Sequence, residues 1–81
     1  MAPSLDDMMI FDAGEKIYNE RFKLNLEITN FGDFFIYDNI SKDHIISKDL
    51  ADGLNEMKKK YPNREFYIKK IGYSGIYGFT R

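Results

Sequence analysis

The chain of 81 residues is short enough to be one small domain, and its seven Phe and six Tyr can build a core from few side chains. It has no Cys, which excludes a disulfide framework, a thiolate nucleophile and a cysteine-rich zinc site. The net charge of −1 conceals an acidic stretch over residues 1–57 and a basic one over residues 58–81, and this division favours an interaction surface or head-to-tail self-association.

Residues 1–19 leave two alternatives open. Ser4, with Asp7 three residues later, fits the start of a helix. The apolar runs on either side of residues 12–15 would equally form a small hairpin. We favour a short helix or an irregular lead-in for this segment.

Strict alternation of apolar and polar side chains marks the next segment. Its apolar members are Phe22, Leu24, Leu26 and Ile28. This period of two predicts a strand near residues 20–30 with one buried and one wet face. The residues that follow, 30–33, tolerate turn geometry, and an apolar run then resumes. We therefore predict a hairpin with strands near 20–30 and 34–38.

The period changes to about 3.6 after residue 47, which predicts a helix. Ser47 occupies the expected N-cap position, and Pro62 ends the helix. Gly53 lies inside it at a cost of about 1 kcal/mol relative to Ala, so we expect close packing there. The apolar stripe of this helix consists of Leu50, Ala51, Leu54 and Met57, followed by Tyr61.

Residues 64–81 predict a strand over about 64–71, a turn through Gly72 to Gly75, and a strand over 76–80. If Phe66 and Ile68 face the core, the side chains between and after them face outward, and we prefer this register because it does not bury Lys69 without a partner. The outer face of the sheet would then be partly exposed or covered by the N-terminal segment. Its members would be Tyr67, Lys69 and Ile71.

Together these elements predict a single α+β domain over residues 1–81. We expect an antiparallel sheet of about four strands in β-β-α-β-β order, packed on one main helix. A short N-terminal helix or irregular lead-in precedes it.

No catalytic set can be assembled from these residues, so we expect neither enzymatic activity nor a cofactor. The closely spaced glycines near the C-terminus are followed by no helix, which argues against a phosphate-binding loop. His44 is the only histidine, and we interpret it as an ordinary surface or packed side chain. Asp49, Asp52 and Glu56 would share one helical face, which we interpret as a solvated face and not a metal site.

We expect a small regulatory or inhibitor module that docks on a protein partner through its C-terminal hairpin, because aromatic residues and Arg are enriched in interface cores. Its size is typical of accessory or phage-encoded regulators. A second candidate surface is the acidic helix face, which would suit a basic partner or imitate nucleic acid. The residues predicted to contact the partner are Tyr67, Lys69, Ile71, Tyr73, Tyr77 and Phe79.

The alternative function is binding of single-stranded RNA or DNA, in which aromatic faces stack on bases and cations follow the backbone. We also expect self-association, in the simplest case as a homodimer. No stretch approaches the roughly 20 apolar residues of a membrane span, so we expect no membrane association and a soluble, cytoplasmic protein. The residues predicted for nucleic-acid binding are Lys58, Lys59, Lys60, Arg64, Lys70 and Arg81.

Overall fold

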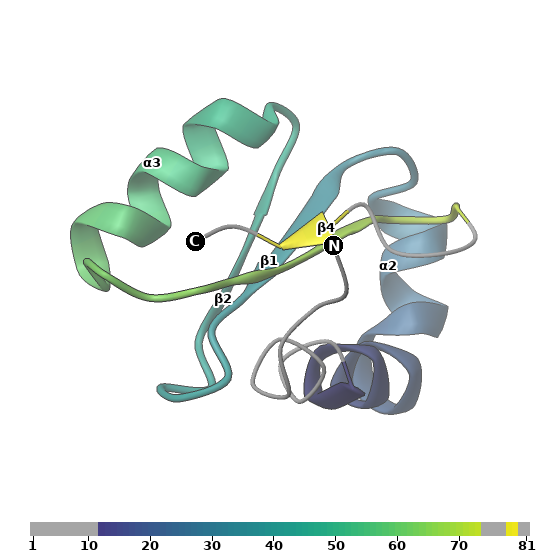
Figure 1. Cartoon of the computed structure of the whole chain (residues 1–81). Helices are drawn as coiled ribbons and strands as arrows, with labels where there is room; N and C mark the ends of the chain where they lie inside the picture. The colour runs from purple at the N-terminus through teal and green to yellow at the C-terminus, as the bar shows by residue number, and fades with distance from the viewer. Residues whose placement is uncertain (1–11, 74–77, 80–81) are drawn as a thin grey trace.

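The computed structural model describes residues 12–73 and the backbone of residues 78–79, and these form an α+β domain with a helical layer on each side of an antiparallel sheet (Figure 1). The N-terminal helix is described from residue 12 onward and continues through a π-helical turn, η1, into α2, which ends at Thr29. The elements are residues 12–17 (helical), η1 (Tyr18–Phe22), α2 (Lys23–Thr29), β1 (Phe34–Tyr37), β2 (His44–Ser47), α3 (Leu50–Lys60), β3 (Tyr67–Lys70) and β4 (Gly78–Phe79).

The sheet has the order β2-β1-β3-β4, and each neighbouring pair is antiparallel. β1 lies at its centre, with Ile36 opposite Ile45 of β2 and Ile68 of β3. β4 contributes two residues beside β3. The predicted α+β class and antiparallel sheet are therefore confirmed, and the strand predicted at 34–38 matches β1.

The strand predicted near residues 20–30 is wrong, because this segment belongs to the N-terminal helix. The hairpin is formed by β1 and β2, and β2 had not been predicted. Residues two apart on an α-helix point about 200° apart, so an alternating sequence places apolar side chains on two opposite helix faces. Leu26 is buried at 7% exposure, whereas Leu24 is 84% exposed and Ile28 is 81% exposed.

The π-helical turn helps to keep the inward-facing residues in line. Gly14, Tyr18, Phe22 and Leu26 are spaced by four, and each such step advances about 40° around a regular α-helix. A π turn takes more residues per turn because its hydrogen bonds span one residue more. It therefore offsets the drift between Tyr18 and Phe22, and the same stripe faces the sheet along the whole helix.

The described part of the lead-in is helical and packs directly on the sheet. Gly14 is buried against Tyr67, and a Cβ atom at position 14 would overlap the Tyr67 ring. Residues 12–17 are helical, so residues 12–15 do not form the turn of a hairpin. The helix start predicted around Ser4 lies outside the described residues.

The predicted main helix is confirmed as α3, with a correction at its start. The N-cap is Asp49, whose carboxylate accepts a hydrogen bond from the Ala51 amide at 3.0 Å. The Ser47 hydroxyl instead donates to the Asp49 carbonyl and accepts from its amide, so it supports the cap from two residues earlier. Gly53 lies close to β1, since an added Cβ would come within 2.7 Å of Ile36 Cδ1. The close packing expected at this glycine is confirmed.

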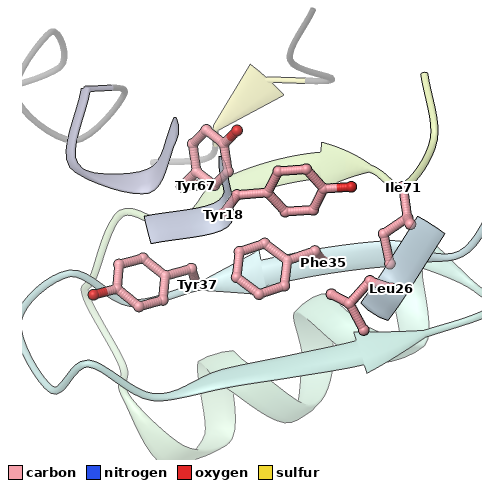
Figure 2. Packing of buried hydrophobic residues seen from close by; sticks show 6 residues of the cluster. All are labelled: Tyr18, Leu26, Phe35, Tyr37, Tyr67 and Ile71. Carbon is pink, nitrogen blue, oxygen red and sulfur yellow. The ribbon is translucent and has the colours of Figure 1, made fainter. Parts of the chain in front are cut away.

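Two hydrophobic clusters lie on opposite faces of the sheet. Ile36, Phe66 and Ile68 pack with Met57 of α3 on one face. The cluster on the other face packs beneath the N-terminal helix (Figure 2), and its buried members are Tyr18, Leu26, Phe35, Tyr37, Tyr67 and Ile71. The predicted facing of Phe66 and Ile68 is confirmed. Of the two alternatives for the opposite face, the structure shows coverage by the N-terminal segment, so the sheet packs between two helices and not on one main helix alone.

The C-terminal turn is described only in part. Gly72 adopts a positive φ of 90°, and a side chain there would overlap the Phe31 ring. Gly75, Ile76 and Tyr77 lie outside the described residues. No helix within residues 12–73 is long and apolar enough to cross a membrane.

Candidate functional site

Three residues predicted to contact a partner are buried in the core. Tyr67 and Ile71 are 0% exposed and Lys69 is 6% exposed, all beneath the N-terminal helix. Their predicted role in docking required the outer sheet face to be exposed, whereas the N-terminal helix covers it. In the folded chain these three side chains hold the helix in place and are not available for docking.

Lys69 is buried together with a carboxylate from the N-terminal helix. The Glu15 carboxylate lies 3.6 Å from Lys69 Nζ and accepts a hydrogen bond of 2.6 Å from the Tyr67 hydroxyl. The Lys69 ammonium also lies 5.2 Å from the centre of the Tyr18 ring. Burial, reinforced by Glu15, raises the pKa of Tyr67 well above its ordinary value. This network joins β3 to the helix and accounts for a lysine in the core.

The remaining predicted contact residues are only partly described. Tyr73 is 49% exposed and is a candidate for contact with a partner. β4 contains Phe79, of which the backbone pairing with Tyr67 is described. Tyr77 and Arg81 lie outside the described residues. The predicted surface is therefore represented by Tyr73 and its neighbour Lys70.

The outer surface of α2 carries apolar side chains that are open to solvent. Leu24 and Ile28 lie one helical turn apart on the side opposite Leu26. Phe31 follows just after the helix, is 62% exposed, and its ring centre lies 5.5 Å from that of Tyr73. We refer to these four residues as the α2 face: Leu24, Ile28, Phe31 and Tyr73.

A cation lies at one end of the α2 face. Lys70 Nζ is 4.7 Å from the centre of the Tyr73 ring and 5.8 Å from that of Phe34. Gly72 permits the turn that places Tyr73 beside Phe31. Sequence reasoning identified Tyr73 and Lys70 but missed Leu24, Ile28 and Phe31, although helical periodicity applied to residues 22–29 would have divided their apolar residues between two faces.

The described residues among those predicted to bind nucleic acid are spread over several elements, although Lys58 and Arg64 line one hollow after α3. Lys58, Lys59 and Lys60 are exposed in the last turn of α3. Arg64 is held by Asp38 through a 2.6 Å ion pair, whereas Lys70 lies beside Tyr73. Two aromatic residues of the same basic stretch, Phe66 and Tyr67, are fully buried and are not available to stack on bases.

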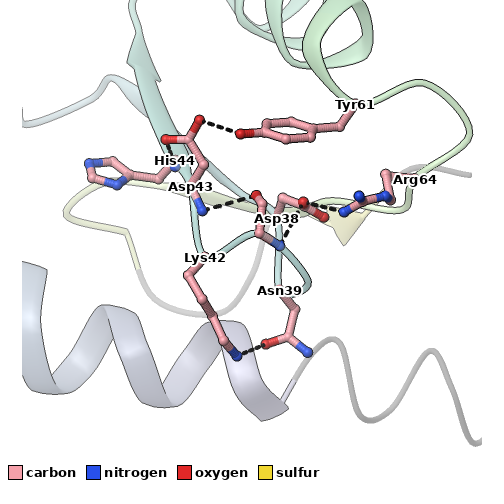
Figure 3. Close-up of polar contacts among 8 residues, drawn as sticks. Asp38, Asn39, Lys42, Asp43, His44, Tyr61 and Arg64 are labelled. Atoms are coloured by element: carbon pink, nitrogen blue, oxygen red, sulfur yellow. Dashed lines mark hydrogen bonds and ion pairs between the residues drawn. The ribbon is translucent and has the colours of Figure 1, made fainter.

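A polar cluster joins the β1–β2 turn to the end of α3 (Figure 3). Asp38, which is 1% exposed, accepts from Arg64 and from the Ser41 amide. The Tyr61 hydroxyl donates to Asp43 at 2.8 Å, and this hydrogen bond lowers the pKa of Asp43 below its ordinary value. These contacts tie two connections together, which is a structural role.

His44 and Asp49 have contacts typical of structural residues. The His44 ring packs against Phe22 and Phe35 at centre distances of 4.7 and 5.5 Å. Asp49 caps α3, whereas Asp52 and Glu56 are exposed on that helix. Within residues 12–73, no group of three or more His, Asp or Glu side chains could hold a metal ion.

Comparison of the chain with protein-family models, with curated proteins and with solved structures finds no match.

Proposed function

We propose that the chain is a small non-enzymatic protein-binding module that regulates or inhibits its partner by docking through the α2 face. The observation that supports this proposal is the exposure of Leu24 and Ile28, at 84% and 81%, on the side of α2 that the sheet does not cover. Burying each of these side chains against a partner would contribute roughly 1.5 to 3 kcal/mol. An apolar helix face of this kind fits the mode in which a helix lies in a groove of its partner.

The ring pair at the end of α2 extends this surface toward the C-terminal hairpin. Phe31 and Tyr73 add two exposed aromatic rings, which are typical anchors of interface cores. Lys70 lies over Tyr73, so a carboxylate of the partner would be favoured at this end. We therefore propose a partner with an apolar groove that carries acidic side chains near the Tyr73 end.

The test compares a variant of the α2 face with a control that changes another exposed isoleucine. Leu24→Lys/Ile28→Lys places charge on the face, whereas Ile40→Lys changes a side chain that is 71% exposed in the β1–β2 turn. Since all three positions are exposed, each variant should keep the thermal midpoint of the wild type. Tagged proteins are used for capture from native lysate, with and without nuclease, and captured proteins are quantified.

The proposal expects a discrete protein that survives nuclease treatment, is lost with Leu24→Lys/Ile28→Lys and is retained with Ile40→Lys. Equal loss of the captured protein with both variants contradicts docking through the α2 face. Capture that is unchanged by the double substitution contradicts it as well. Nucleic acid recovered only without nuclease would instead support the single-stranded nucleic-acid alternative. A dimer in light scattering that the double substitution dissociates would identify a second copy as the occupant.

A further inference from the structure

A hollow of about 450 Å³ lies between the N-terminal helix and the turn that joins β1 to β2. Its volume is in the range of small-molecule sites, about 300 to 1,000 Å³. The helix side is formed by the π-helical turn and the residue before it, and π turns occur frequently at functional sites. The lining residues are Ile17, Glu20, Arg21, Phe22, Tyr37 and Lys42.

Tyr37 presents a hydroxyl to this hollow from a side chain that is otherwise buried. It is 3% exposed, and its ring stacks on Phe35 with a centre distance of 6.1 Å and an interplanar angle of 9°. The hydroxyl points away from the other five residues of the cluster (Figure 2). It has no hydrogen-bond partner among the described residues, so it offers a donor held in place by a rigid ring.

Two cations line the same hollow from opposite sides. Arg21 is exposed on the π-helical turn and forms no ion pair within the described part of the chain. The Lys42 ammonium has one weak contact, 3.4 Å to the Asn39 side-chain oxygen, and extends toward the N-terminal helix (Figure 3). Lys42 adopts a left-handed φ of 66°, which is uncommon for a residue with a side chain.

The charges around Tyr37 favour a negative ligand. Burial and the neighbouring Asp38 raise the pKa of Tyr37, so it is a neutral donor at physiological pH, and Arg21 partly offsets this shift. Asp38 is itself paired with Arg64 on the other side of the turn. Glu20 is the acidic residue on the lining, and it is exposed, so two cations outnumber one anion.

We propose that this hollow binds a small organic anion, a carboxylate or a phosphate ester, that carries an apolar group. Arg21 and Lys42 pair with the anion, because cations with few protein partners can form charge-assisted hydrogen bonds without first breaking others. The Tyr37 hydroxyl donates to one anion oxygen. Ile17 and Phe22 contact the apolar group. The α2 face takes no part, so this proposal is independent of the docking function.

The experiment is a titration of the isotopically labelled chain followed by amide NMR shifts. The probes are phenyl phosphate, phenylacetate and the neutral 2-phenylethanol, which share an aromatic group and differ in charge. The expected result is saturable shifts at residues 17–22, 37 and 42 with one or both anions, and weaker binding of 2-phenylethanol. The anion that binds more tightly shows whether the ligand of the hollow is a phosphate ester or a carboxylate.

Matched variants test the assignment of each group. Arg21→Gln and Lys42→Gln should each weaken anion binding about tenfold, and Tyr37→Phe, which keeps the buried ring, about fivefold. Lys23→Gln removes an exposed charge outside the lining and should leave affinity unchanged. The absence of saturable shifts with both anions, equal binding of 2-phenylethanol, or an equal loss with Lys23→Gln overturns the proposal.

Discussion

Replacing Leu26 with Ala should reduce the free energy of unfolding by about 2 to 3 kcal/mol, whereas Leu24→Ala should change it by less than about 0.5 kcal/mol. The two leucines are two residues apart and belong to the same alternating pattern. Leu26 is 7% exposed and packs with Phe35 and Ile71 under the helix, while Leu24 is 84% exposed. This pair of variants therefore distinguishes a helix from a strand.

The magnitude follows from the surroundings of each side chain. Leu→Ala substitutions in cores cost about 2 to 5 kcal/mol, and the lower part of this range applies because Leu26 lies at the margin of a cluster and retains some exposure. The surrounding aromatic rings are large and cannot easily close the space. At position 24 little buried area is lost, and Ala is the better helix former.

Urea unfolding followed by circular dichroism measures both free energies, and equal slopes would show that the denatured states are comparable. A strand over residues 20–30 would place Leu24 and Leu26 on the same buried face, so both substitutions would cost a similar amount. Similar losses, or a larger loss for Leu24→Ala, would refute the helical assignment and with it the α2 face.

Two further predictions concern the contact between the N-terminal helix and the sheet. Gly14→Ala should reduce the free energy of unfolding in urea by about 2 kcal/mol. The cost of overlap with the buried Tyr67 ring exceeds the gain of about 1 kcal/mol in helix propensity. A stabilised variant would contradict this packing. Burial and the hydrogen bond to Glu27 raise the pKa of Tyr18 to about 12 from 10.0, so the stability that this neutral hydroxyl contributes is present below pH 10 and is lost as the pH rises toward 12. Tyrosinate absorbance and circular dichroism should therefore change together in this range. Tyr18→Phe should lose less stability than the wild type over the same pH range. Ionisation of every tyrosine near pH 10 without unfolding would be inconsistent with the buried site.

The elements that sequence could predict are those whose pattern has one physical interpretation. The apolar stripe after residue 47, with acids early and lysines late, fits only an amphipathic helix, and α3 matches it. Phe66 and Ile68 were correctly placed on one face because period two is fixed along a strand. At the cap, both Ser47 and Asp49 are good candidates, and local hydrogen bonding selected Asp49.

Residues 22–29 could not be assigned from local pattern alone. Their alternation favours a strand, but Leu, Lys and Glu are good helix formers, and residues 12–22 lead into them as a continuous helix. Contacts distant in sequence decide the outcome, because Leu26 packs against Phe35 and Ile71. The exposed Leu24 and Ile28 follow from this choice, so the proposed docking surface was hidden by the same ambiguity.

The burial of Lys69 shows why the sequence left open whether the outer sheet face is covered. A lysine in a strand normally indicates solvent, and a buried one is costly without a partner. Here the partner is Glu15, more than fifty residues earlier in the chain, which the sequence gives no means of pairing with Lys69. Because Glu15 binds Tyr67 and Lys69 from the helix over this face, these two residues of β3 are used for folding.

The same arrangement determines where binding can occur. With a helix on each side, both faces of the sheet are occupied, so a ligand or partner has to approach the outer helix surfaces, the turns at the ends of the strands or an edge of the sheet. The N-terminal helix provides both proposed binding places. Its inward stripe packs on the sheet, whereas the outer side of α2 exposes Leu24 and Ile28. Its π-helical turn forms one wall of the Tyr37 hollow. A substitution that detaches this helix should therefore abolish docking and anion binding together, whereas substitutions on the α2 face or in the hollow should affect only one of them.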